Sequence, residues 1–341
     1  AQRNVDATGV SANGFATVDR FTADQSGTDE YIEQHQVDVS SGTTPYTLGF
    51  RKAFQVKNGN QSSGAGTSDR VTIAYKIEAQ DMANSGWNYN SASSFVTFSY
   101  WVKSSVAQNF YNRFKSADSP SQAYVTETGS LSADTWTKIT KTISGNSNIV
   151  FNNDNGEGLE ITWELFRGTS QTGTRPLNAW ATSDNNTRTP DQTSTWYTTN
   201  DATFEITGVQ LEVGSVATDF EHRSFGQELA LCQRYFYQIN GNNGDISISG
   251  GFLNASEFFV LVDFPVTMRA TPSYTGSATA FRLVGGADSG SKNLNNLGLW
   301  GSGLPTNIAL IVSSTSGGTT GYSGAIQFQA DNGFLQFSAE L

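Results

Sequence analysis

Three short segments place Trp and Tyr among small polar residues. They are Gly86-Trp87-Asn88-Tyr89-Asn90, Asn178-Ala179-Trp180-Ala181-Thr182 and Ser194-Thr195-Trp196-Tyr197-Thr198. Aromatic rings in polar loops can stack against the C–H faces of sugars, and nearby amide, carboxylate and guanidinium groups can bind sugar hydroxyls. The pattern therefore predicts carbohydrate binding. It leaves open a second interpretation, in which the rings cap a core or fill a subunit interface.

The candidate glycan-binding residues come from these segments, from the polar run after the second one and from a late loop. They are Trp87, Tyr89, Trp180, Asp184, Asn186, Arg188, Trp196, Tyr197 and Trp300. By contrast, Trp101, Trp136 and Trp163 lie within segments that alternate between apolar and polar residues. We expect these three in the core.

Catalytic chemistry has weak support in the sequence. Glycoside hydrolysis needs two carboxyl groups about 5–9.5 Å apart, and with 31 Asp and Glu residues some such pair is unavoidable. Glu160, Glu164 and Glu205 are the carboxyls to inspect, although they alternate with apolar residues as on any outward strand face. The chain has two His and no nucleophile-elbow, zinc-protease or phosphate-loop motif. We expect no catalytic residue.

One turn has the composition of a weak calcium site. Between Asn152 and Glu157 it offers the oxygen ligands Asp154, Asn155 and Glu157, which a hard cation prefers. It departs from the EF-hand pattern, because it has neither a Glu at the twelfth position nor flanking helices. A plain Asn-rich turn is the competing interpretation. We expect no cofactor beyond a possible structural Ca²⁺.

Charge and composition exclude several classes of partner. The net charge is −11 and the Lys and Arg residues are scattered singly, which argues against nucleic acid and anionic membranes. No apolar run reaches the roughly 20 residues that span a bilayer, so we expect no membrane insertion. A single cysteine, Cys232, allows no disulfide within the chain.

Short alternating segments dominate the rest of the sequence. Examples are 71–77, 95–102, 136–143, 159–165 and 204–211, in which β-branched or aromatic residues alternate with hydroxyl or charged residues. Turn-forming clusters rich in Asn and Gly separate them. The pattern predicts an all-β fold with two antiparallel β-sandwich domains, jelly-roll-like, joined by a short helix.

The predicted helix covers 226–236, where strong helix formers place apolar residues at i, i+3 and i+7. It separates two strand-rich regions. We therefore predict a jelly-roll domain at 1–222, a helical connector at 223–237 and a distal β-sandwich domain at 238–341.

Three stretches around this connector form a recognisable block: 206–214, 217–221 and 228–236. The block resembles one common in bacteriophage tail fibre proteins, where it closes a carbohydrate-binding-module-like jelly roll and leads into a distal β-domain. Further similarity lies at Ala1–Asn4 with Thr17–Phe21, at Phe264–Pro272 and at the closing Ala339–Leu341. The opening strand of that family normally begins several residues earlier, so we expect further residues before Ala1.

The resemblance implies a virion protein of the phage tail, located outside the cell, that adheres to the host as a homotrimer. We expect trimer contacts at Leu229, Cys232 and Phe236, other virion proteins as partners through the missing N-terminal part, and host cell-surface polysaccharide as ligand. Two alternatives remain: a structural decoration or connector protein without ligand, and, with weaker support, a polysaccharide depolymerase.

Overall fold

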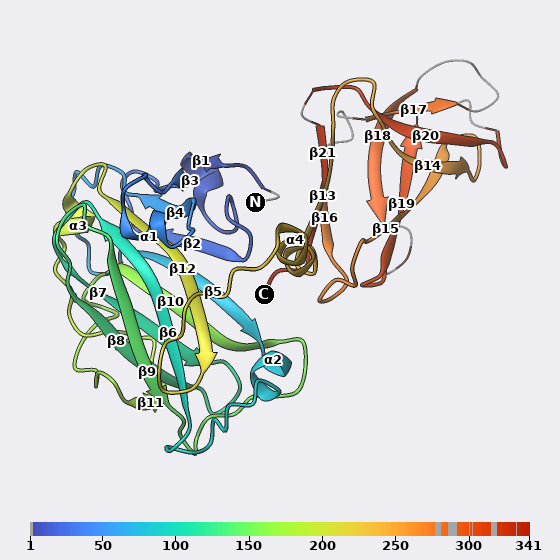
Figure 1. The fold of residues 1–341 in the computed structure, drawn as a ribbon. Helices are drawn as coiled ribbons and strands as arrows, with labels where there is room; N and C mark the ends of the chain where they lie inside the picture. The colour runs from blue at the N-terminus through green and yellow to red at the C-terminus, as the bar shows by residue number, and fades with distance from the viewer. Residues whose placement is uncertain are drawn as a thin grey trace. The chain divides into compact units, whose positions relative to one another are not determined.

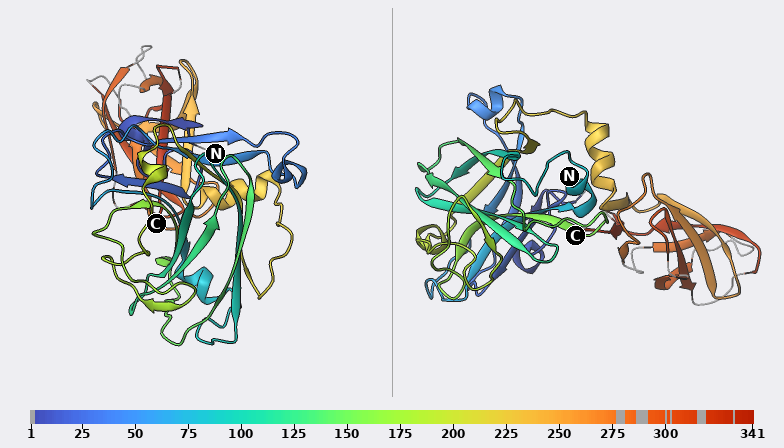
Figure 2. Two further views of the ribbon diagram at one scale, coloured as in Figure 1. Left: turned by 90° about the vertical axis from the view of Figure 1, so that its left-hand side faces the viewer. Right: turned by 90° about the horizontal axis from the view of Figure 1, so that it is seen from below.

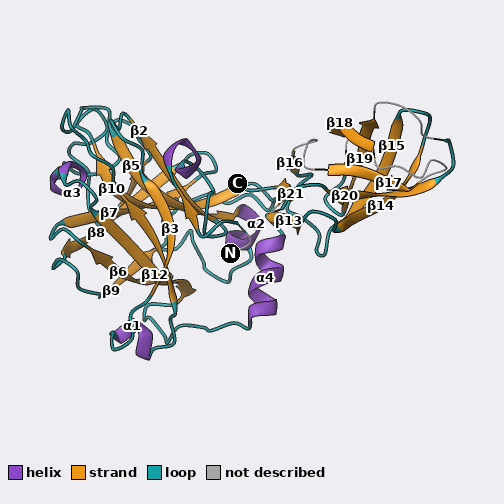
Figure 3. Ribbon diagram, turned by 90° about the horizontal axis from the view of Figure 1, so that it is seen from above, coloured by secondary structure: helices purple, strands orange, loops and turns teal. Residues whose placement is uncertain are grey.

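The computed structural model describes residues 3–276, 281–285, 292–299, 301, 303–314, 319–331 and 333–341. The chain forms two compact units, Arg3–His222 and Arg223–Glu340, each treated by itself below (Figure 1). Antiparallel strands are the main secondary structure of both units (Figure 3), which confirms the predicted all-β class. Within the described ranges, no helix has the length and apolar character needed to cross a membrane.

The N-terminal unit contains a first sheet of six antiparallel strands. In sheet order they are β1 (Asp6–Ala7), β3 (Glu33–Asp38), β4 (Lys52–Lys57), β12 (Thr203–Val213), β6 (Phe95–Ser104) and β9 (Thr137–Ser144). The last strand of the unit, β12, lies between β4 and β6. The first sheet therefore joins residues far apart in the sequence, as in a jelly roll.

The second sheet of this unit also has six antiparallel strands. In sheet order they are β11 (Trp180–Thr182), β8 (Gln122–Ser130), β7 (Asn109–Ser116), β10 (Glu157–Arg167), β5 (Arg70–Glu78) and β2 (Phe21–Ser26). Figure 2 follows the strands of this unit from blue to yellow. Their inner faces share one hydrophobic core.

Period-two alternation decides which side chains enter that core. On β6, Phe98, Tyr100 and Val102 are buried inside it, whereas Trp101 points to the outer face of the first sheet and is half-buried. On β10 the inward residues include Trp163, which is buried as predicted. The expectation of a core position was wrong for Trp101 and for the half-buried Trp136, because both belong to the outward half of the alternation.

Short helices connect strands in the N-terminal unit. They are the 3-10 turn η1 (Gly9–Ala12) and the α-helices α1 (Thr44–Thr47), α2 (Ala79–Ala83) and α3 (Thr195–Thr198). None exceeds five residues. Each of them lies in a connection between two strands.

The C-terminal unit begins with α4 (Phe225–Gln233). Ser224 caps it: the Ser224 hydroxyl accepts from the Gln227 amide, and the Gln227 side chain accepts from the Ser224 amide. The predicted helix is confirmed but shorter, because Phe236 already begins strand β13 and is buried. Aromatic residues such as Tyr235 and Phe236 favour strands over helix interiors.

Two sheets follow α4. The first has three strands, β13 (Phe236–Gly241), β21 (Gly333–Ser338) and β16 (Ser273–Gly276). The second is a closed barrel of β14 (Ile246–Phe252), β15 (Glu257–Asp263), β19 (Asn307–Ser314), β18 (Lys292–Leu299), β17 (Phe281–Gly285) and β20 (Ser323–Phe328). The expected distal sandwich is thus corrected to a barrel, because β20 pairs with β14 on one side and β17 on the other.

Candidate functional site

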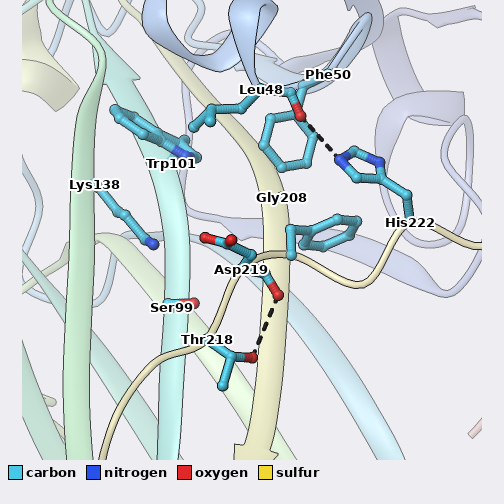
Figure 4. A pocket seen from close by; sticks show the side chains of 10 residues that line it. Leu48, Phe50, Ser99, Trp101, Lys138, Gly208, Thr218, Asp219 and His222 are labelled. Atoms are coloured by element: carbon cyan, nitrogen blue, oxygen red, sulfur yellow. Dashed lines mark hydrogen bonds between the residues drawn. The ribbon is translucent and has the colours of Figure 1, made fainter.

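A pocket of about 240 Å³ lies on the outer face of the first sheet (Figure 4). Its lining residues come from the loop after α1, from β6, β9 and β12, and from the segment after β12. They are Leu48, Phe50, Ser99, Trp101, Lys138, Gly208, Thr218, Asp219, Phe220 and His222. All of them belong to the N-terminal unit.

One wall of the pocket is aromatic. The rings of Phe50 and Phe220 meet edge to face with centroids 4.9 Å apart, and His222 lies 5.3 Å from Phe50 and 5.0 Å from Phe220. The Nε2 of His222 donates to the carbonyl oxygen of Leu48 over 2.9 Å. Because this bond and the two ring contacts hold the imidazole, the wall is formed before any ligand arrives.

A backbone irregularity in β12 makes room for this wall. The pairing of β12 with β6 shifts between Thr207 and Gln210, and Gly208 within the shift has φ of 60°. A Cβ at Gly208 would lie 2.5 Å from Cζ of Phe50, so only glycine allows that ring to rest on the strand. The bulge therefore leaves room for the Phe50 ring that lines the pocket.

The segment after β12 is fixed to the same strand by side chains. Glu212 accepts from the Thr218 amide at 2.9 Å and from the Thr218 hydroxyl at 2.6 Å, and Gln210 accepts from the Glu221 amide at 2.9 Å. Burial alone would raise the pKa of Glu212, but the bonds from Thr218 lower it below the ordinary value. Glu212 is therefore ionised at neutral pH and holds Thr218, the residue that precedes Asp219 and Phe220.

The opposite wall joins an indole to charged groups. Trp101 and Lys138 are paired across β6 and β9, and Figure 4 shows them across the pocket from Phe50 and His222. Asp219 lies between the two walls, and Lys138 and Asp219 are both exposed. An apolar ring surface beside donors and acceptors is suited to a small polar ligand with an apolar face.

Beside the pocket, the polar side chains of Gln55, Glu205 and Lys103 lie next to one another on the same outer face. Glu205 accepts from Gln55 Nε2 at 3.0 Å and pairs with Lys103 Nζ at 2.9 Å, and Lys103 lies 5.3 Å from the centre of the Trp136 ring. Glu205 is thus neutralised by a lysine and held by an amide. That arrangement is typical of a structural carboxylate rather than of a general acid.

Three of the candidate sugar-binding aromatics are buried in the core. Trp196 is fully buried, and its Nε1 donates to the Thr203 carbonyl at 3.1 Å. Tyr197 stacks on Phe166 with centroids 4.3 Å apart and donates to Asp69 Oδ2 at 2.9 Å. Trp87 is 3% exposed. These side chains fill the core, as the second interpretation had it, and they do not line the pocket.

The other candidates do not line the pocket either. Tyr89 is half-buried and packs edge to face on Phe151 with centroids 4.9 Å apart. Trp180 is half-buried and donates to the Ser144 carbonyl at 2.7 Å. Asp184 accepts from the Asn186 amide at 2.9 Å in an exposed turn. Arg188 lies near buried carboxylates of the second sheet, and Trp300 is outside the described residues.

Two of the three candidate calcium ligands already have partners in the structure. Asp154 Oδ1 accepts from the Gly156 amide at 2.8 Å, and Glu157 pairs with Lys76 at 2.7 Å and with Lys115 at 3.4 Å. Burial would raise the pKa of Glu157, but these lysines lower it. In the described ranges, no three His, Cys, Asp or Glu side chains are grouped so as to hold a metal. Asn155 is exposed, and a calcium ion there stays a prediction.

Glu164 differs from a typical general acid. It is fully buried on β10 and accepts from Arg167 Nε at 2.6 Å. Burial would raise the pKa of Glu164, but the charges of Arg167 and Arg188 lower it. General acids for glycosidic bonds need a raised pKa, so the direction at Glu164 is the opposite one.

The connector residues expected at a trimer contact differ in exposure. Leu229 and Cys232 are half-buried on α4, and Phe236 is buried in β13. On the same helix Phe225 is 81% exposed. Phe236 is therefore a core residue of its own unit, and Leu229 and Cys232 remain candidates for contact.

Sequence reasoning missed the pocket. Phe50, Gly208 and Phe220 come from three distant segments, and no local pattern brings them together. Two signals were available: the outward position of Trp101 in its alternating strand, and the block at 217–221, which supplies Asp219 and Phe220.

No protein-family model matches the sequence, and no curated protein matches it. Among solved structures, a carbohydrate-binding module described as "CBM4 structure and function" aligns over 57% of this chain and 95% of its own, with 12% identity and a TM-score of 0.31. The enzymatically active domain of bacteriophage CBA120 tailspike protein 4 aligns over 62% of this chain and 22% of its own, with 10% identity and a TM-score of 0.32.

A third similar structure is the CBM22-1 xylan-binding domain from Paenibacillus barcinonensis Xyn10C. It aligns over 64% of this chain and 99% of its own, with 9% identity and a TM-score of 0.29. Similarity at this level assigns no function to the chain. The functional argument therefore rests on the pocket itself.

Proposed function

We propose that this protein is a non-catalytic carbohydrate-binding protein, and that the pocket on the first sheet holds a sugar ring. The observation that supports the proposal is the arrangement of Trp101, Phe50 and Phe220 beside Lys138 and Asp219. Sugar rings have apolar C–H faces and polar edges, and this pocket offers a matching surface for both.

The size of the pocket suggests how a glycan would bind. Its volume of about 240 Å³ is below the roughly 300–1,000 Å³ of sites for drug-sized ligands. A single ring therefore fits better than a run of several. We propose that the pocket takes one terminal or branch sugar and that the rest of the glycan stays in solvent.

The biological setting is part of the same proposal. The resemblance of 206–236 to tail fibre proteins supports a role as a virion adhesin of the phage tail that binds host surface polysaccharide as a homotrimer. Other virion proteins would be its partners in the particle. The half-buried Leu229 and Cys232 on α4 would contribute to the trimer contact.

A structural role without ligand is the second candidate, and one observation favours it. Phe50, Phe220 and His222 pack on one another, so the pocket wall also fixes the segment that leads from β12 to α4. In that case the aromatic wall would serve only to fix the start of the connector.

The test is a binding measurement with the purified chain. Immobilised surface polysaccharides and a panel of free monosaccharides would be titrated against wild type and Trp101→Ala. We expect saturable binding by wild type and a loss of at least tenfold in affinity for the variant, which is about 1.4 kcal/mol. Released reducing ends would be measured on the same samples, and their accumulation would instead support a depolymerase.

Trp136→Ala is the matched control. Trp136 is also a half-buried tryptophan on the outer side of the first sheet, but it does not line the pocket. We expect its affinity to stay within about twofold of wild type. No binding by a folded wild-type protein across the panel would instead favour the structural role.

A further inference from the structure

The pocket on the first sheet has aromatic rings on two opposite sides. One wall is formed by Phe50, Phe220 and His222, whose rings pack on one another with centroids 4.9 to 5.3 Å apart. The other wall contains the indole of Trp101, which lies across the pocket from Phe50 and His222 (Figure 4). A flat ring bound between the two walls would therefore present one of its faces to each of them.

A hydroxyl that points at either wall would meet ring atoms. The rings of Phe50 and Phe220 offer only carbon atoms, and the Nε2 of His222 is already used in its bond to the Leu48 carbonyl oxygen. Across the pocket, Trp101 presents an indole. A hydroxyl placed against these rings loses its hydrogen bonds to water without replacing them, which is unfavourable.

Two charged side chains of the pocket are available to a ligand. Neither Lys138 nor the carboxylate of Asp219 forms an ion pair or a hydrogen bond within the part of the chain that the structure describes. The ammonium can therefore donate to a ligand and the carboxylate can accept from it. Other lysines of this unit each pair with a carboxylate, namely Lys52, Lys57, Lys76, Lys103 and Lys115.

The charges around Lys138 favour a neutral ligand. Lys138 lies close enough to Glu212 to help lower the pKa of that carboxyl, and Asp219 lines the same pocket. Lys138 thus already has carboxylates of the protein nearby. A neutral sugar, whose hydroxyls both donate and accept, therefore suits the pocket better than an acidic one.

We propose that the pocket selects a neutral hexose whose ring hydroxyls are all equatorial, as in a β-glucoside. Both faces of such a ring carry only C–H groups, which suit the two walls. Its hydroxyls point outward around the edge of the ring, where Lys138 and Asp219 can bind them. The inference rests on the proposed function, because it names the sugar that the same pocket takes.

Two epimers of this sugar test the two walls separately. In a β-galactoside the axial hydroxyl at C4 points out of one face of the ring, and in a β-alloside the axial hydroxyl at C3 points out of the opposite face. If both walls touch the sugar, the pocket rejects both epimers, whichever way round the ring binds. A pocket in which one wall touches the sugar would reject only one of them.

The test titrates the purified chain with the methyl β-glycosides of glucose, galactose and allose, followed by calorimetry or by NMR of the protein. We expect the glucoside to bind at least about tenfold more tightly than either epimer. Equal affinity for all three, or rejection of only one epimer, would overturn the inference and leave the sugar-binding pocket intact. Failure of the glucoside to bind would also overturn it, and failure of every sugar in the panel would overturn the proposed function as well.

A pair of lysine variants locates the site. Lys138→Met should weaken glucoside binding at least about fivefold, because it removes a charged donor. Lys141→Met is the matched control: Lys141 is also on β9, but it is paired with the inward-facing Phe98 and does not line the pocket. Its affinity should equal that of wild type. Equal losses in the two variants would contradict a role of Lys138 in the pocket.

Phe220→Ala tests the wall itself. Because it removes a ring from one side of the pocket, we expect the rejection of one epimer to weaken, while the other epimer is still rejected at the Trp101 side. Unchanged rejection of both epimers by the folded variant would show that this wall does not touch the sugar. Lys138→Met keeps the site testable if Phe220→Ala does not fold.

Discussion

The two outer faces of the N-terminal sandwich follow the same alternation and yet differ in what stabilises them. On the first sheet, aromatic rings, the hydrogen bond from His222 and the carboxylate of Glu212 fix the covering segment, and Lys138 and Asp219 stay exposed. On the second sheet, buried ion pairs such as Glu164 with Arg167 lie directly on the strands. The first face, covered by apolar rings, has a pocket, whereas the second face is stabilised by ion pairs between buried side chains.

A substitution in the core between the two sheets should lower the free energy of unfolding more than a substitution on either outer face. Trp196→Ala removes a fully buried indole and should lower the free energy of unfolding by about 3–5 kcal/mol. Trp101→Ala, at a half-buried position, should cost clearly less. Urea unfolding of the two variants measures the difference, and equal losses would mean that Trp101 is as much a core residue as Trp196.

Glu164→Gln should cost about 3 kcal/mol, because it leaves Arg167 and Arg188 without their buried carboxylate. The pKa of Glu164 is lowered in the folded state. Its contribution to stability is therefore present above the ordinary carboxyl pKa of about 4.3 and is lost as the pH falls through the lowered value. Unfolding curves of both proteins over this pH range should converge in acid.

Asp24→Asn is the control for that prediction. Asp24 pairs with Arg70 at 2.7 Å on the same sheet, but its side chain is 44% exposed. Its loss should cost less than about 1 kcal/mol. If Glu164→Gln and Asp24→Asn lowered the free energy of unfolding equally, the buried pair of Glu164 would be no stronger than an ordinary surface pair.

Gly208→Ala should destabilise the first face by more than about 1 kcal/mol, because it combines a positive φ with a collision against Phe50. Gly86→Ala is the matched control: Gly86 has φ of 85°, and its added Cβ would meet no atom within 4 Å. The difference in melting temperature between the two variants isolates the contact with Phe50. Equal shifts would show that the ring does not depend on the bulge.

Thr218→Val should have the smallest effect, below about 1 kcal/mol, since it removes one hydroxyl bond to an exposed segment. The informative readout is the pKa of Glu212. Burial raises that pKa and the bonds from Thr218 lower it, so the variant should move it upward. Carboxyl titration by NMR detects the shift, and an unchanged pKa would mean that the segment is fixed by its aromatic residues alone.

Alternation in the sequence was sufficient to predict the all-β class and the inward position of Trp163. The same alternation places Trp101 outward, opposite to Phe98 and Tyr100, although Trp101 was expected in the core because it lies within an alternating segment. The burial of Trp196 and Tyr197 was not predictable, because a polar loop that folds onto the core looks in sequence like one that stays in solvent. The ion pairs of Glu164 with Arg167 and Arg188 were not predictable either, because they depend on how the strands and the loop after β10 lie in space.

The closed barrel of the C-terminal unit limits how this protein can associate through its backbone. Each of its six strands has a neighbour on both sides, so none of them offers an unpaired edge to which a strand of another copy could add. The outer strands β13 and β16 of the three-stranded sheet do present such edges among the described elements. Among the described strands of this unit, β13 and β16 are therefore the ones at which a strand of another copy could add, and the described barrel strands could contribute side chains to such a contact.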